Sequence, residues 1–519
     1  MKQILSLIKF PFLLILIGIV VYANSIDNPF IWDDNVFIKN NPTIKDIQYF
    51  PHIFTKNLLE HNTIKGDFYR PVQGLSLMID YFFWRSNPVG YHITNFLLHL
   101  LCALLVYFLV NDIIRNQLAS FFTGLLFLIH PVQTEAVTYI SGRADPLAAV
   151  FILSAFLLYI RATTPISTTW STFSYIGAIF MFIIAIFSKE TSLILPVLLL
   201  LYEFYIWGID KFFRKVRVII LRLAPFWGLV IIYLVIRFTL LTQITKFVHT
   251  TSVGLGARAM TFLTTIPVYI RLLFIPMDLH MERSIPMPSS LFEPRVLIAL
   301  GVLFFAIVCI VRTYRFSREI SFGLVWFFVA LMPVSNLITP LNAVMAEHWL
   351  YLPSIGIFMV IGIGVSKLLL KAVNTKRVII IIITAYLIFL STLTILRNVE
   401  WGNAIIFYKN AIRYSPDSYR LHYNLGVTYM SKNLYQEAII EFNNAIEIDT
   451  SRVREAVKQN LPVLLNLSLP DAHYNIGIAY ANQGLLEKAI EEWQKALEIN
   501  PNLESAKICI EEAKKALMK

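Results

Sequence analysis

The sequence is poor in cysteine and in charge. Its three cysteines, Cys102, Cys309 and Cys509, form neither a disulfide framework nor a zinc-ligand spacing. Charged residues make up only 15% of the chain and hydrophobic residues 57%, which excludes an ordinary soluble protein. The net charge of +11 comes without any nucleic-acid recognition motif, so we expect no nucleic-acid partner.

Long apolar runs dominate what is present. Several approach the roughly 20 residues that a helix needs to cross a bilayer, which predicts an all-α, multi-pass membrane domain. The basic segments between these runs, at 211–222, 312–318 and 367–377, are typical of cytoplasmic connectors. Placing them inside gives about eleven transmembrane helices, a cytoplasmic N-terminus on an uncleaved first span, and a last span ending near Leu396. This topology requires the segment from Ala257 to Ile275 to lie along the membrane.

The same topology puts most polar residues of the membrane domain on the non-cytoplasmic face. First among them are Asp33 and Asp34, in the long loop after the first span. Two adjacent carboxylates disfavour simultaneous ionisation, so one of them is suited to act as a general base. Acids that follow a span also serve as solvated flanks or helix caps, and the pair alone does not decide between these roles.

Further ionisable residues on this face fall largely into pairs of opposite charge. His130 and Arg143 are candidates to contact a phosphate, because arginine suits bidentate contact with phosphate oxygens. Arg143 and Asp145 could instead neutralise each other. Lys189 with Glu190 and Glu347 with His348 repeat this pairing, and three such pairs on one face indicate a polar cavity. The remaining candidates are Glu135 and His99, which follows Asn95 by four residues and fits a structural hydrogen bond equally well.

After Leu396 the composition changes to polar helix formers with a period of 34 residues. Ala438 and Phe442 follow Ala404 and Tyr408 at this spacing, which is the tetratricopeptide period. We predict a membrane domain over 1–396 and a tetratricopeptide-repeat α-solenoid over 397–519, with two full repeats, a leading half repeat and a final capping helix. The topology places the repeats on the same face as the polar loops, where they would form a docking platform for a protein partner.

Motifs in a fixed order link this chain to a known family. They are Trp32-Asp33-Asp34, Tyr69-Arg70-Pro71, His130-Pro131, Gly142-Arg143-Ala144-Asp145, Ser188-Lys189-Glu190-Thr191 and Tyr351-Leu352-Pro353-Ser354. Together with the repeats, they resemble the transmembrane and tetratricopeptide-repeat-containing protein O-mannosyltransferases and their bacterial relatives. That family belongs to the GT-C glycosyltransferases, polytopic enzymes that take a sugar from a polyprenyl-phosphate carrier on the lumenal or periplasmic side.

The resemblance implies a reaction and roles for these residues. The expected function is inverting transfer of a mannose-like hexose from a polyprenyl-phosphate donor to an acceptor hydroxyl of a polypeptide or glycan, with a bacterial inner membrane favoured. Asp33 or Asp34 would be the catalytic base, and we favour Asp34 because it lies one residue further from the span. Arg70, His130, Arg143 and Lys189 would stabilise the phosphate, while His99, Glu135, Asp145, Glu190, Glu347 and His348 would support the site.

Three points stay open in the sequence. A divalent cation held by the paired acids is an alternative to the metal-independent mechanism that we expect. His348 stands where the family commonly has an arginine, and the chain has fewer repeats than eukaryotic members, so the acceptor is less defined than the donor. The competing functions are a polysaccharide polymerase or ligase that uses polyprenyl-linked sugars, and a non-enzymatic membrane-anchored repeat scaffold.

Overall fold

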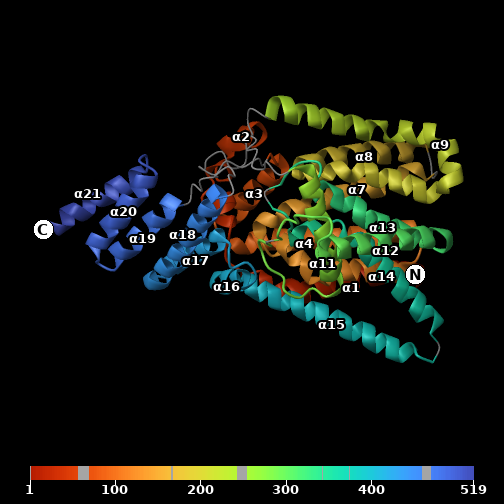
Figure 1. Ribbon diagram of the computed structural model, residues 1–519. Coiled ribbons are helices and arrows are strands. Elements are labelled where there is room, and N and C mark those ends of the chain that lie inside the picture. Colours follow the sequence, from red (N-terminus) through yellow and green to blue (C-terminus); the bar gives the residue numbers. More distant parts are fainter. Residues whose placement is uncertain are drawn as a thin grey trace. The chain divides into compact units, whose positions relative to one another are not determined.

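A computed structural model describes residues 2–56, 69–164, 168–241, 254–283, 285–341, 343–372, 374–458 and 469–518. All regular secondary structure in these residues is helical, as Figure 1 shows, and the predicted all-α class is confirmed. The chain divides into two compact units, one of Met1–Leu279 with Ser284–Gly402 and the other of His280–Arg283 with Asn403–Lys519. The division falls six residues after the domain boundary that the sequence predicts, because the last helix of the first unit continues to Trp401.

The first unit is built from apolar helices. Its helices are α1 Lys2–Tyr22, α2 Phe50–Thr55, α3 Pro71–Trp84, α4 Pro88–Ile114, α5 Gln117–Ile129, α6 Thr134–Val137, α7 Ala144–Thr163, α8 Thr168–Ser188, α9 Leu195–Ile236, α11 Leu255–Phe274, α12 Pro294–Phe316, α13 Arg318–Leu331, α14 Ser354–Lys371 and α15 Lys376–Trp401. Helix α9 bends at Gly208, which has a φ of 65°. Gly208 lies against Arg318, and a Cβ added to the glycine would be 2.6 Å from the guanidinium.

Eight helices among the described residues are long and apolar enough to cross a membrane. One of them is α11, over the segment that the predicted topology places along the membrane. Two shorter apolar helices, Lys9–Ser25 and Gln117–Ile129, accompany them. The prediction of a multi-pass membrane protein is confirmed, whereas the number of spans and their orientation stay predictions.

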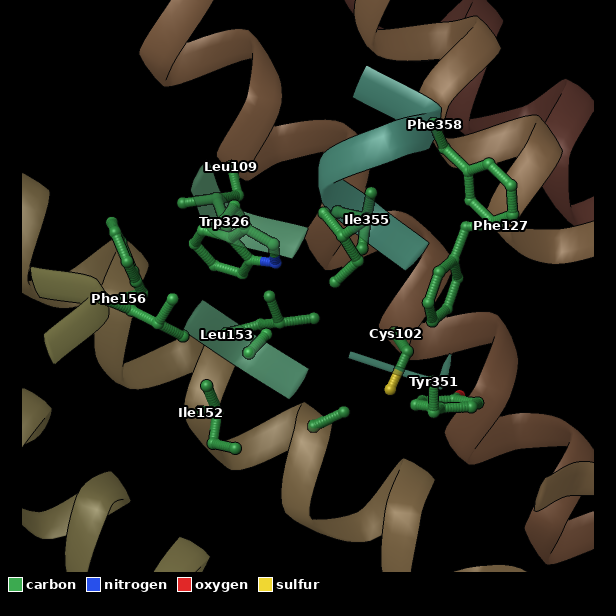
Figure 2. Close-up of a cluster of buried hydrophobic side chains, with 14 of the residues drawn as sticks. Cys102, Leu109, Phe127, Ile152, Leu153, Phe156, Trp326, Tyr351, Ile355 and Phe358 are labelled. Atoms are coloured by element: carbon green, nitrogen blue, oxygen red, sulfur yellow. The ribbon is translucent and has the colours of Figure 1, made fainter. Parts of the chain in front are cut away.

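The core of the first unit lies where α4, α5, α7, α13 and α14 meet. Figure 2 shows side chains from these helices interdigitating, with Phe156 of α7 near Trp326 of α13 and the Cys102 sulfur of α4 directed toward Tyr351. Helices α13 and α14 approach closely at Gly323 and Gly356, where a Cβ on either would come within 2.6 Å of the other's carbonyl oxygen. Small residues at crossing points are typical of helix packing in membranes, where no water is expelled to drive association.

The second unit consists of short amphipathic helices. They are α16 Ala404–Tyr414, α17 Tyr419–Ser431, α18 Tyr435–Lys458, α19 Leu469–Asn482, α20 Leu486–Ile499 and α21 Glu504–Leu517. Helix α20 ends just before Pro501, whereas α18 runs through Thr450 to Lys458, because threonine retains the amide proton that a proline lacks. Part of the insertion predicted after the first full repeat is therefore a continuation of α18.

Candidate active site

The paired acids lie in the loop that follows the first helix, just before the short helix Asn35–Lys39, in unlike surroundings. Trp32, just before them, has a φ of 54°, a left-handed conformation that costs a non-glycine residue about 1–3 kcal/mol. The side chain of Asp33 is exposed, whereas that of Asp34 is completely buried. The turn thus points two adjacent carboxylates in different directions.

Three hydrogen bonds hold Asp34. Its Oδ1 accepts from the backbone N of Ser141 at 2.8 Å and from the Ser141 hydroxyl at 2.6 Å, and its Oδ2 accepts from the Ile31 N at 3.2 Å. Burial raises the pKa of Asp34 to about 7, although these hydrogen bonds oppose the rise, and the charge of Asp33 adds to it. Asp34 ties the first loop to the short turn Ile140–Arg143 that precedes α7.

Tyr139 is the side chain next to Asp33. Its hydroxyl lies within hydrogen-bonding reach of the Asp33 carboxylate, and its ring stacks on Trp401 at the end of α15, with ring centroids 5.4 Å apart and planes at 13°. Burial, together with the charges of Asp33 and Asp34, raises the pKa of Tyr139 well above its ordinary value, so the phenol remains a hydrogen-bond donor.

Arg143, a candidate to bind phosphate, is fully buried, and its guanidinium forms an ion pair and hydrogen bonds with other residues of the chain. It forms an ion pair with Asp80 of α3 at 2.5 Å, and its Nε donates to the Asn95 side chain at 2.6 Å. Nη2 also donates to the Tyr91 carbonyl at 3.0 Å. Asp145, the alternative partner considered from the sequence, pairs elsewhere, because residues i and i+2 do not share a helix face.

Arg70 and Lys189 form a second charged cluster with two acids. Arg70 makes a bidentate pair with Glu190, with Nε and Nη2 donating at 3.0 and 2.6 Å. Lys189 donates to Asp145 at 2.6 Å. The Arg70 side chain is 13% exposed and that of Glu190 35%, so this pair is accessible whereas the Arg143 pair is not. The structure therefore brings together four of the residues that the sequence singled out.

His130, which follows α5, and His99 of α4 are both buried and hydrogen-bonded to protein groups. His130 accepts from the Val132 N at Nδ1, and its Nε2 is 3.2 Å from the Leu273 carbonyl, an arrangement that fits the neutral ring. Burial lowers the pKa of His130 to about 3. His99 similarly joins the Tyr351 hydroxyl, at 2.8 Å, to the Leu128 carbonyl, at 3.0 Å.

Glu135 and His348 form a further pair. The Glu135 carboxylate accepts from the His348 backbone N at 2.9 Å and contacts its ring Nδ1 at 2.8 Å. Burial alone would raise the pKa of Glu135, but the charge and hydrogen bonds of His348 outweigh it and the pKa lies below its usual range. Glu347, its neighbour, is buried, while the His348 side chain is 26% exposed.

Sequence reasoning did not single out Asp80, Ser141, Tyr139 or Trp401. Ser141 and Tyr139 adjoin the Gly142-Arg143-Ala144-Asp145 motif, so proximity to that motif was the available signal. No comparable sequence signal pointed to Asp80 or Trp401, because each contacts a residue from a distant segment of the chain. Within the described residues, no group of three or more His, Cys, Asp or Glu side chains is arranged as a metal site.

Known proteins match the chain in both units. Two matches to the tetratricopeptide-repeat family cover residues 419–452 and 470–503, which confirms the predicted repeats. The human protein O-mannosyl-transferase TMTC3 is 25% identical over 94% of this chain and 55% of its own length. The human protein O-mannosyl-transferase TMTC4 is 28% identical over 82% of this chain and 64% of its own length. The chain thus spans between half and two thirds of these relatives.

One solved structure, ArnT from Cupriavidus metallidurans bound to undecaprenyl phosphate, is 13% identical, with a TM-score of 0.44 over 94% of this chain and 79% of that one. The resemblance predicted from the ordered motifs is confirmed by the sequence matches to the curated relatives and by the repeats. The chain is similar over most of its length to the transmembrane and tetratricopeptide-repeat-containing protein O-mannosyltransferases.

Proposed function

We propose that this chain is a GT-C-type membrane glycosyltransferase that moves a mannose-like hexose from a polyprenyl-phosphate donor to a protein serine or threonine hydroxyl. The names of its relatives support the sugar and the acceptor. The observation that carries the proposal is the division of the acid pair into an exposed Asp33 beside Tyr139 and a buried Asp34 fixed by Ser141. Asp33 is exposed toward an incoming acceptor, whereas Asp34 holds the turn in place.

In the reaction that we propose, Asp33 is the general base, which reverses the preference drawn from sequence position. Its carboxylate takes the proton of the acceptor hydroxyl as that oxygen attacks the anomeric carbon. The bond from this carbon to the phosphate oxygen breaks, and the polyprenyl phosphate leaves with the electron pair. Attack from the face opposite the phosphate inverts the anomeric configuration. Asp34 remains bound to Ser141 throughout and positions Asp33.

Arg70 and Lys189 are the cations that we assign to the leaving phosphate. The Arg70 side chain is 13% exposed and that of Lys189 6%, and each is held by an acid, Glu190 or Asp145, that a phosphate could replace. The planar fork of Arg70 matches two phosphate oxygens as it matches the Glu190 carboxylate. We assign Arg143 and His130 positioning roles instead, because their polar atoms are buried in contacts with protein.

The repeats and the membrane orientation complete the proposal. Tetratricopeptide arrays bind proteins along extended surfaces, which supports a role in presenting the acceptor polypeptide. With basic connectors on the cytoplasmic side, the N-terminus is cytoplasmic, and the acids and the repeats face the periplasm or lumen.

The test uses the full chain in lipid nanodiscs with polyprenyl-phosphate mannose and serine- or threonine-containing peptides. Mass spectrometry should detect a hexose on the peptide, and NMR should give it the anomeric configuration opposite to that of the donor. Polyprenyl-phosphate glucose is the matched donor that tests the preference for mannose. Absence of transfer with every donor and acceptor, by protein shown to be folded, would contradict the proposal.

A further inference from the structure

The last two turns of α15 differ from the rest of that helix in their burial. Over its most apolar stretch α15 has little of its surface buried, yet Thr394, Asn398 and Trp401 are 0 to 1% exposed. These residues recur every three or four positions, so they lie on one helix face. That face is directed toward the segments that carry the candidate base.

Asn398 joins three of these segments. Its Nδ2 donates to the Val21 carbonyl and to the Asn24 side chain, both at 3.1 Å, at the end of α1. Its Oδ1 accepts from the Thr138 hydroxyl at 2.6 Å, and its backbone carbonyl accepts from the Asn28 side chain at 2.9 Å. Both ends of one amide are therefore satisfied, and the first loop is fastened to the residue before Tyr139.

Trp401 holds Tyr139 itself. The two rings stack in parallel, both side chains are almost completely buried, and the Tyr139 hydroxyl lies within reach of Asp33. A stacked ring pair fixes the plane of the tyrosine, and with it the line along which its hydroxyl points. The direction of a donor beside a catalytic carboxylate decides how well that carboxylate is oriented toward an acceptor.

We propose that Trp401 and Asn398 are positioning residues for the transfer reaction, which act by holding Tyr139 and Thr138 so that the Tyr139 hydroxyl orients the Asp33 carboxylate. This inference rests on the proposed function, because it assumes that Asp33 is the base. Neither residue touches the substrate in this arrangement. Trp401 acts through Tyr139, and Asn398 acts through Thr138 and the first loop.

The test compares Trp401→Leu, Trp401→Phe and Tyr139→Phe in full-length protein in nanodiscs. Trp401→Leu should lower kcat by about 10- to 100-fold, because the base is no longer aligned, while the KM for the polyprenyl-phosphate donor changes little. The acidic limb of its pH–rate profile should move to higher pH, as it does in Tyr139→Phe, since a carboxylate that loses a hydrogen-bond donor is protonated more readily. Trp401→Phe retains a ring to stack and should restore most of the rate.

A double-mutant cycle separates positioning from a general loss of structure. If Trp401 acts through Tyr139, the variant carrying both Trp401→Leu and Tyr139→Phe should have the pH profile and nearly the kcat of Tyr139→Phe alone. Trp326→Leu, which removes an equally buried tryptophan in the apolar cluster of Figure 2, is the matched control. It should lower the thermal midpoint without moving the pH profile.

Two results would overturn the inference. One is a Trp401→Leu enzyme whose kcat and pH profile match the wild type, and the other is strictly additive losses in the double variant. Both would leave the proposed function intact, provided that the wild type transfers sugar and Asp33→Asn does not. Failure of the wild type to transfer sugar would instead contradict the proposed function.

Discussion

Ser141 donates two hydrogen bonds to one carboxylate oxygen of Asp34, although the two residues are 107 positions apart in the chain. The turn that carries Ser141 has little freedom. Gly142 follows it, and an added Cβ there would come within 2.4 Å of the Glu135 carbonyl oxygen. The location of the acid pair is therefore set by the tight packing of the turn before α7 as well as by the first loop.

The first prediction separates the two acids. Asp33→Asn should lower kcat by about 10²- to 10⁴-fold, the range expected when a general base is lost. Asp34→Asn keeps an oxygen that can accept from Ser141, so its kcat should fall by about tenfold or less. Initial rates of sugar transfer at saturating donor measure both effects. A larger loss from Asp34→Asn than from Asp33→Asn would reverse the assignment of the base.

The second prediction concerns stability and pH. Asp34 in the folded chain has a pKa of about 7, whereas in an unfolded chain an aspartate titrates near 4. Between about pH 4 and pH 7 the folded chain therefore holds a proton that the unfolded chain has lost, so stability falls as the pH rises through this window. The loss from this group is up to about 4 kcal/mol.

Thermal midpoints of wild type and Asp34→Asn, measured from pH 4.5 to 8 by intrinsic fluorescence, test this linkage. The variant cannot take up the proton, so its stability relative to wild type should rise with pH. Asp33→Asn is the control, since it changes an exposed side chain and leaves the buried Asp34 carboxyl in place. Parallel curves for wild type and Asp34→Asn would contradict the raised pKa.

The third prediction concerns Arg70. Arg70→Gln should raise the KM for the donor by about 10- to 100-fold, since two charge-assisted hydrogen bonds to phosphate are lost. Arg70→Lys should recover part of the loss, because it keeps the charge but not the fork. Arg271 of α11 offers a matched control: its Nη1 and Nη2 also make a bidentate pair with a carboxylate, that of Asp278, at 2.8 and 3.0 Å, and its side chain is 42% exposed. Equal effects of Arg70→Gln and Arg271→Gln on donor KM would exclude the assignment.

The sequence was informative where a pattern is local. Apolar length predicted the last helix of the first unit, α15, and the 34-residue period predicted the repeats, because each pattern reports a short-range geometry. The sequence did not predict which charged residues form ion pairs with each other. Arg143 pairs with Asp80 in a different helix, whereas Asp145, only two residues away, pairs with Lys189. Such choices depend on how distant helices pack, which local spacing does not encode.

The last prediction follows from that pairing and distinguishes a structural arginine from one that binds substrate. Removing one partner of a buried ion pair leaves an uncompensated charge, so Arg143→Met should destabilise the first unit by about 3–5 kcal/mol and lower the yield of folded protein. Replacing both partners, as Arg143→Met with Asp80→Leu, should restore much of the stability, since an apolar pair of similar volume leaves no buried charge unpaired. Thermal midpoints of the two variants, compared with Arg70→Gln, provide the measurement, because loss of the more exposed Arg70 should alter donor binding more than stability. If the Arg143→Met protein has normal stability and a raised KM for the donor, Arg143 binds the donor phosphate and is not a structural residue.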